Sequence, residues 1–107
     1  MIALSVRQPY ANRIATGAKK RESRTWTTSH RGDLVIVSSR HGAEAGGPGP
    51  FGVTICLVEL ADIVRPRGDR IFQWILRNPR PLEPMVVKGQ LGLYTVDDSL
   101  VLLPPEG

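Results

Sequence analysis

Cysteine is almost absent from this sequence, and its scarcity excludes two kinds of site. Cys56 is the only cysteine in the 107 residues, so an internal disulfide and a zinc site built from several cysteines are both excluded. It lies in a run rich in β-branched residues, where we expect a buried core thiol. His30 and His41 fall in loop-like segments without metal-ligand spacing. We therefore expect neither a metal nor a cofactor.

Long apolar runs and common catalytic motifs are missing as well. No apolar run approaches the roughly 20 residues of a membrane-spanning helix, and Met1–Arg7 lacks the features of a secretory signal. We therefore expect a cytoplasmic protein without a membrane partner. The sequence contains no P-loop, no G-x-G-x-x-G and no G-x-S-x-G motif, which removes support for P-loop, dinucleotide and α/β-hydrolase sites.

Positive charge is concentrated in the first third of the chain. The net charge is only +4, but residues 1–31 hold seven basic residues and one acid, whereas residues 32–107 hold seven basic and nine acidic residues. Such a concentration is typical of a surface that faces phosphate groups. The alternative is a solvated face without a partner. The length suits one domain over residues 1–107, and no segment resembles an interdomain linker.

The N-terminal third predicts a strand, a short helix and a second strand. Ala3–Val6 has a strand pattern, and Pro9 suits the first turn of a helix that starts near Arg7 or Gln8 and ends before Gly17. Residues 20–27 mix polar and aromatic side chains. In a strand, Glu22, Arg24 and Trp26 share one face there.

The rest of the chain predicts mostly strands. A glycine- and proline-rich loop is expected at 42–52. A second short helix is expected near 69–77, begun by Asp69 and burying Ile71, Phe72 and Ile75. Strands are expected at Leu34–Ser38, Val53–Val64, Met85–Val87, Leu91–Val96 and Leu100–Leu103. This order favours an α+β fold built as a small barrel or rolled sheet.

One motif remains at the junction of the first helix and the second strand. Gly17-Ala18-Lys19-Lys20-Arg21-Glu22-Ser23-Arg24 matches G-x-K-x-x-E-x-R and resembles the signature of the ASCH domain family. Further segments resemble that family in the same order, namely 4–11, 24–26, 31–36, 58–60, 74–82 and 87–94. The chain departs from many relatives at 40–52, where a short loop stands in place of a longer helical insertion.

The resemblance implies a PUA-like β-barrel with a cleft beside the first helix, and binding of RNA or a nucleotide-like small molecule. The residues themselves point the same way. Lys19 and Arg24 suit phosphate, Tyr10 or Trp26 can stack a base, and Glu22 can accept a hydrogen bond from an exocyclic amine. The candidate ligand-binding residues are Arg7, Tyr10, Lys19, Lys20, Glu22, Arg24, Trp26 and Arg31.

Several of these residues have structural alternatives. Trp26 and Trp74 can both be core anchors, and Glu22 and Arg24 can pair with each other. Glu59 interrupts an apolar strand, so we expect it either at a water-filled cleft or paired to a buried base, near Lys19 or Arg24.

A second hypothesis is an enzyme. Some small ASCH proteins are similar to amidohydrolases that deacetylate N4-acetylcytidine with a lysine, a hydroxyl residue and a carboxylate. Lys19 and Glu59 match two of those roles, with Glu22 as a third candidate catalytic residue standing where the hydroxyl is expected. Ribonuclease activity is a weaker alternative, because no histidine pair supports it.

Overall fold

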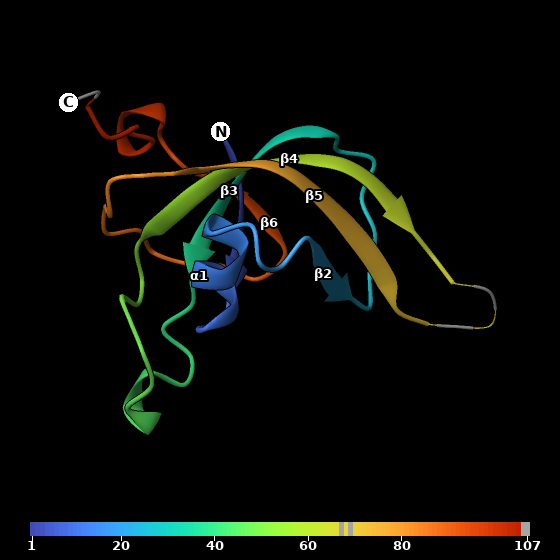
Figure 1. The fold of residues 1–107 in the computed structure, drawn as a ribbon, viewed down its shortest axis with the longest axis horizontal. Helices are drawn as coiled ribbons and strands as arrows, with labels where there is room; N and C mark the ends of the chain where they lie inside the picture. Colours follow the sequence, from blue (N-terminus) through green and yellow to red (C-terminus); the bar gives the residue numbers. More distant parts are fainter. Residues whose placement is uncertain (67, 69, 106–107) are drawn as a thin grey trace.

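The computed structural model describes residues 1–66, 68 and 70–105, which form a mostly β structure with one short α-helix (Figure 1). Its elements, with the 3-10 helices labelled η, are β1 (Ile2–Val6), α1 (Tyr10–Ala15), β2 (Arg21–Arg24), β3 (Gly32–Ser38), η1 (Ala43–Ala45), β4 (Thr54–Val64), β5 (Phe72–Pro81), β6 (Leu93–Thr95) and η2 (Asp98–Leu100). The segments that separate these elements are rich in glycine, proline and serine.

The strands form one sheet in the order β2-β5-β4-β3-β1-β6. β1 and β3 are parallel, and the other neighbouring pairs are antiparallel. The sheet curls so strongly that the side chain of Arg24 on edge strand β2 donates a hydrogen bond of 2.8 Å to the backbone carbonyl of Ser5 on β1. These strands stand four places apart in the sheet order. The fold is therefore a half-barrel whose two sides approach each other between β2 and β1.

The larger core cluster lies between α1 and the sheet. Ala11 and Ile14 are the buried residues of the helix, and they belong to one cluster with Leu4, Val58 and Trp74. Apolar residues three positions apart on a helix share a face, which explains why this short helix packs here. Gly17 ends the turn with a φ of 82°, a conformation that glycine adopts without steric cost.

A second cluster covers the other face of the sheet. Val35, Val37 and Leu57 point there, and residues from the C-terminal part of the chain pack against them, namely Leu82, Val87, Tyr94 and Val96. The long strands β3 and β4 are thus buried on both faces through much of their length. This explains their nearly continuous apolar sequences.

The predicted helix near 69–77 is wrong. Residues 72–81 form β5, which pairs with β4 on one side and with β2 on the other, while Asp69 lies outside the described residues. Trp74 and Leu76 are buried, whereas Ile75 between them is only half-buried. Two partner strands supply backbone hydrogen bonds to this aromatic and β-branched segment, and this tertiary pairing outweighs the helical spacing of its apolar residues.

The C-terminal strands are shorter than expected. Residues 85–87 contribute a single bridge between Val86 and Val53, and β6 spans only Leu93–Thr95. Leu100–Leu103 forms no strand; Leu100 ends η2, and the residues after it have no regular structure. The other strand predictions are confirmed within a few residues, as is the shared face of Glu22 and Arg24.

Candidate functional site

A cleft of about 1000 Å³ lies where β2 approaches β1. Five segments line it: the end of β1 with the start of α1, strand β2, the end of β3 with the residues after it, Gly52 before β4, and the loop before β6. The lining residues are Leu4, Ser5, Val6, Arg7, Tyr10, Glu22, Arg24, Ser38, Ser39, Arg40, His41, Gly52, Val86, Lys88, Gly89, Gln90, Leu91 and Gly92.

The cleft carries a strong excess of positive charge. Its wall includes the four permanent cations Arg7, Arg24, Arg40 and Lys88 but only one carboxylate, Glu22. A concave surface lined by one sign of charge focuses its field and attracts ligands of the opposite charge. The cleft therefore suits an anionic ligand.

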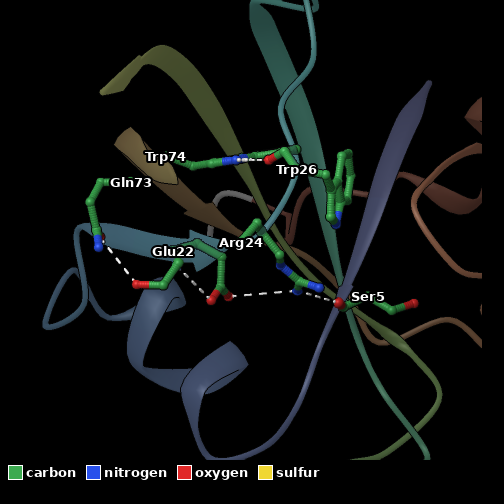
Figure 2. A network of polar contacts seen from close by, with 7 residues as sticks. Ser5, Glu22, Arg24, Trp26, Gln73 and Trp74 are labelled. Atoms are coloured by element: carbon green, nitrogen blue, oxygen red, sulfur yellow. Dashed lines mark hydrogen bonds and ion pairs between the residues drawn. The ribbon is translucent and has the colours of Figure 1, made fainter. Parts of the chain in front are cut away.

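Arg24 is held in place at the seam of the half-barrel. Figure 2 shows its side chain extending from β2 toward Ser5 on β1, with Glu22 on the same side of the strand. Pairing between β1 and β6 ends at Leu4 and Leu93, so the next carbonyl, that of Ser5, accepts from the guanidinium instead. This contact fixes one cation in the wall of the cleft.

The Glu22 carboxylate is buried and only partly hydrogen-bonded. Its Oε1 atom accepts from the backbone N–H of Ser23 at 3.1 Å, and its Oε2 atom lies 3.9 Å from a guanidinium nitrogen of Arg24. That distance is too long for a hydrogen bond. Glu22 Oε2 and Arg24 Nε are both buried without a hydrogen-bond partner. Unpartnered buried polar atoms are costly, and at the wall of a cleft they indicate a place where a ligand can supply the missing partners.

Ser5, whose carbonyl accepts from Arg24, also contacts Tyr94 from the second core cluster. Their hydroxyl groups are 2.7 Å apart, and burial raises the pKa of Tyr94 while its hydrogen bond with Ser5 opposes that shift. Gly89 passes directly over Ser5, because a Cβ atom at Gly89 would lie only 3.0 Å from the Ser5 hydroxyl oxygen. A glycine at this position lets the loop before β6 come close to β1.

Tyr10 stands at the start of α1 and is 47% exposed. The Lys19 ammonium lies 5.4 Å from the centre of its ring, and the Arg13 guanidinium lies 5.7 Å from it. Both distances are within the range of cation–π contacts. An exposed aromatic ring flanked by cations at the mouth of a basic cleft is the arrangement that stacks a base next to a phosphate.

The structure brings four of the predicted ligand-binding residues together. Arg7, Tyr10, Glu22 and Arg24 all line the cleft. Lys19 does not line the cleft itself, but its ammonium group lies next to the ring of Tyr10, which does.

Three other predicted residues lie elsewhere. Trp26 packs against the larger core cluster and edge-on against Trp74, with ring centres 4.8 Å apart, so it acts as a core anchor. Arg31 is exposed in the turn before β3, where it donates to the carbonyls of Thr28 and His30. Lys20 lines a different cavity, together with Lys19.

Glu59 is not where the sequence predicts it. It is exposed on β4, directly opposite Asp33 on β3 and Arg77 on β5. Successive residues of a strand point to opposite faces, and Val58 beside it is the residue that enters the larger core. Glu59 therefore points away from the larger core, and it lines neither the cleft nor the cavity beside Lys20.

Sequence reasoning missed Arg40, Lys88 and Gln90, which complete the cleft. They lie outside residues 1–31, where the positive charge is concentrated. The structure shows how Arg40 reaches the cleft: Gly52 has a φ of 71°, and a Cβ atom at this position would collide with the Arg40 side chain. Lys88 is also the only base between residues 81 and 105.

Within residues 1–66, 68 and 70–105, no three His, Cys, Asp or Glu side chains gather closely enough to hold a metal ion. In the same part of the chain, no helix has the length and apolar character to cross a membrane.

Known structures share this fold. The crystal structure of an ASCH protein from Zymomonas mobilis is similar with a TM-score of 0.69 and 15% sequence identity, covering 92% of this chain and 88% of that chain. A point mutant of that protein gives a TM-score of 0.70 at 15% sequence identity, and the match covers 90% of this chain and 89% of that chain. A search of curated proteins by sequence finds no match. The model of the ASCH domain matches residues 4–89, and this chain therefore belongs to the ASCH domain family, a PUA-like fold often associated with RNA binding.

Proposed function

We propose that the cleft binds RNA or a nucleotide-like ligand. The observation that carries this proposal is the Glu22–Arg24 pair, which is buried in the wall of a cation-lined cleft with one carboxylate oxygen and one guanidinium nitrogen lacking hydrogen-bond partners. A nucleobase presents donors and acceptors side by side on its edge. It is thus the kind of group that can pair with a carboxylate and a guanidinium together.

The charge distribution orients such a ligand. Phosphate is repelled by Glu22 and attracted by Arg7, Arg40 and Lys88, which line the same cleft. We therefore place the base edge toward Glu22 and Arg24 and the phosphate toward the other cations. Tyr10 at the mouth can stack a second base.

The amidohydrolase hypothesis has less support from the geometry. It requires Lys19 and Glu59 to act on one bond, but Lys19 lies over the ring of Tyr10 and Glu59 is exposed opposite Asp33 and Arg77. Glu22 stands where this chemistry expects a reactive hydroxyl, and the nearest hydroxyl residues, Ser23 and Thr25, are exposed. Binding without turnover is the function that this arrangement favours.

The proposal is tested by a thermal-shift screen of ribonucleosides, ribonucleotides and short oligoribonucleotides, because a ligand that binds only the native state raises its melting temperature. We expect phosphorylated ligands to raise the melting temperature of the parent protein. The shift should be lost in the double variant Arg40→Gln/Lys88→Gln and retained in Arg31→Gln, which removes an exposed charge outside the cleft. A screen in which no nucleotide shifts the parent protein would overturn the proposal. N4-acetylcytidine is included in the screen, and release of cytidine from it would favour the enzyme instead.

A further inference from the structure

A second cavity of about 340 Å³ lies at the opposite end of α1 from the cleft mouth. It is lined by Ile14, Gly17, Lys19, Lys20, Val58, Leu76, Arg77, Asn78 and Pro79. Its volume falls in the range of pockets that hold small ligands. The cavity is formed where the turn after α1 passes β5.

The lining combines an apolar floor with a basic rim. Ile14, Val58 and Leu76 belong to the larger core cluster. The basic residues Lys19, Lys20 and Arg77 also line the cavity, and no acidic residue does. A flat apolar ring suits the floor, and a phosphate suits the rim. Both groups occur together in a nucleotide.

The C-terminal end of α1 does not repel an anion bound in this cavity. The carbonyl of Arg13 accepts from the N–H of Lys19 at 2.9 Å, and the carbonyl of Ile14 accepts from the N–H of Gly17 at 3.1 Å. Carbonyls at the C-terminal end of a helix carry partial negative charge when they lack partners. Here these hydrogen bonds satisfy them.

β5 bends beside the cavity. Between the pairs Leu57–Arg80 and Glu59–Arg77, β5 has one residue more than β4, and Asn78 in this bulge has a φ of 52°. A bulge of this kind bends its strand and changes the direction of the side chains. It brings the segment that contains Arg77 and Pro79 to the cavity.

Lys19 and Tyr10 connect the second cavity to the cleft. Lys19 lines the second cavity, while its ammonium lies 5.4 Å from the ring of Tyr10, which lines the cleft. α1 has six residues and is thus about 9 Å long at 1.5 Å per residue. A stacked strand rises about 3.4 Å per nucleotide, so roughly three nucleotides cover that length.

We propose that the second cavity is a subsite for another nucleotide of the same RNA strand whose first nucleotide occupies the cleft. The strand passes Tyr10 and Lys19 between the two positions. Lys20 and Arg77 bind the phosphate at the second position, and Ile14, Val58 and Leu76 contact the base. This inference rests on the proposed function of the cleft, but it concerns different residues.

The test compares a ribopentanucleotide with the ribonucleoside monophosphates by titration against the parent protein and two double variants. Lys20→Gln/Arg77→Gln removes two cations of the second cavity. Arg21→Gln/Arg31→Gln removes two exposed cations that line neither cavity, and is the matched control for net charge. We expect Lys20→Gln/Arg77→Gln to weaken pentanucleotide binding about tenfold or more and to lower the slope of log K against log salt by about 0.7, the value for one phosphate contact on a single strand. Monophosphate binding should be unchanged.

Each other outcome is informative. An equal loss in the Arg21→Gln/Arg31→Gln control would show a general effect of charge and overturn the subsite. Equal loss of monophosphate binding would also overturn it, because the second cavity would then not be separate from the cleft. If Arg40→Gln/Lys88→Gln alone weakens the pentanucleotide, the subsite is wrong and the function of the cleft stands. If the parent binds no nucleotide, both proposals fall together.

Discussion

Glu22 and Arg24 face each other across 3.9 Å in the wall of the cleft, close enough for an ion pair and too distant for a hydrogen bond. Each retains one buried polar atom without a partner. A pair built only for stability would close this gap, because a buried charge is stabilised by short hydrogen bonds to its partner. Under the proposed function, a bound group completes the pair.

Glu22→Gln should change the selectivity of the cleft. The amide keeps the size of the side chain and an acceptor oxygen, but it loses the negative charge that favours an exocyclic amine. We expect preference for bases that carry this amine over uracil-type bases to fall by about 1–3 kcal/mol. Titration calorimetry with cytidine and uridine monophosphates measures the difference, and an unchanged ratio of the two affinities would contradict the orientation proposed for the base.

Arg24→Ala should weaken both stability and binding. The substitution leaves the buried Glu22 carboxylate without its cation and removes the hydrogen bond to Ser5 that joins β2 to β1. Loss of one partner of a buried pair costs about 3 kcal/mol. Urea denaturation measures this loss. Arg24→Ala/Glu22→Gln should recover part of it, because the unpaired charge is then gone, and failure to recover would show that the ion pair is not the cause.

Gly52→Ala should displace Arg40 from the cleft. A Cβ atom at Gly52 would collide with the Arg40 side chain, and the φ of 71° is unfavourable for alanine. We expect weaker nucleotide binding and a loss of stability of about 1 kcal/mol. Gly47→Ala is the matched control, since a Cβ atom there has nothing within 4 Å. Wild-type affinity in Gly52→Ala would show that Arg40 makes no contact with the ligand.

Trp74→Ala should cost about 3–5 kcal/mol of unfolding free energy. Trp74 is fully buried, packs edge-on against Trp26 and donates from its indole nitrogen to the Trp26 carbonyl at 3.3 Å. Trp74→Phe should retain more of the stability because a ring still fills the core. Chemical denaturation of the two variants gives the order of their unfolding free energies. A larger loss of stability in Trp74→Phe than in Trp74→Ala would contradict the packing argument.

The Cys56 thiol should be unreactive in the folded protein. Burial raises its pKa from 9.0 to about 12, with the charge of Arg80 acting in the opposite direction. Only the thiolate is nucleophilic, so iodoacetamide at pH 8 should label Cys56 after unfolding but not before. Rapid labelling of the native protein would show that the thiol is accessible.

The same shift predicts a loss of stability at alkaline pH. Between pH 9 and 12 the unfolded chain releases the Cys56 proton while the folded protein retains it. The unfolded state then binds fewer protons, so the free energy of unfolding falls as pH rises. A pKa raised by this amount corresponds to at most about 4 kcal/mol. Cys56→Ala should show a weaker dependence on pH in this range, and an unchanged dependence would assign the loss to other groups such as Tyr94, whose pKa is also raised.

The site illustrates which features follow from local pattern. The alternation along residues 21–26 predicts that Glu22 and Arg24 share a face, and β2 confirms it. The amphipathic spacing of Ala11 and Ile14 likewise predicts the buried face of α1. These results depend only on the periods of strand and helix, which neighbouring residues along the chain determine.

Long-range pairing decided the features that the pattern predicted incorrectly. The segment expected as a helix became β5 because it lies between β2 and β4. The pattern predicts Glu59 at a water-filled cleft or paired to a buried base, near Lys19 or Arg24, but in the register with Asp33 and Arg77 it is exposed and points away from the larger core. A shift of one residue in register reverses which side chains face the core, and no local signal specifies that register.

The sequence by itself therefore determined the family, the strand-rich fold, the core helix and the orientation of Glu22 and Arg24. Only the tertiary structure decided that Arg40 and Lys88 join them and that Lys19 lies between two cavities. The physical reason is the curl of the sheet. It brings strands that are distant in the sheet order to within hydrogen-bond distance, and the cleft exists only where they meet.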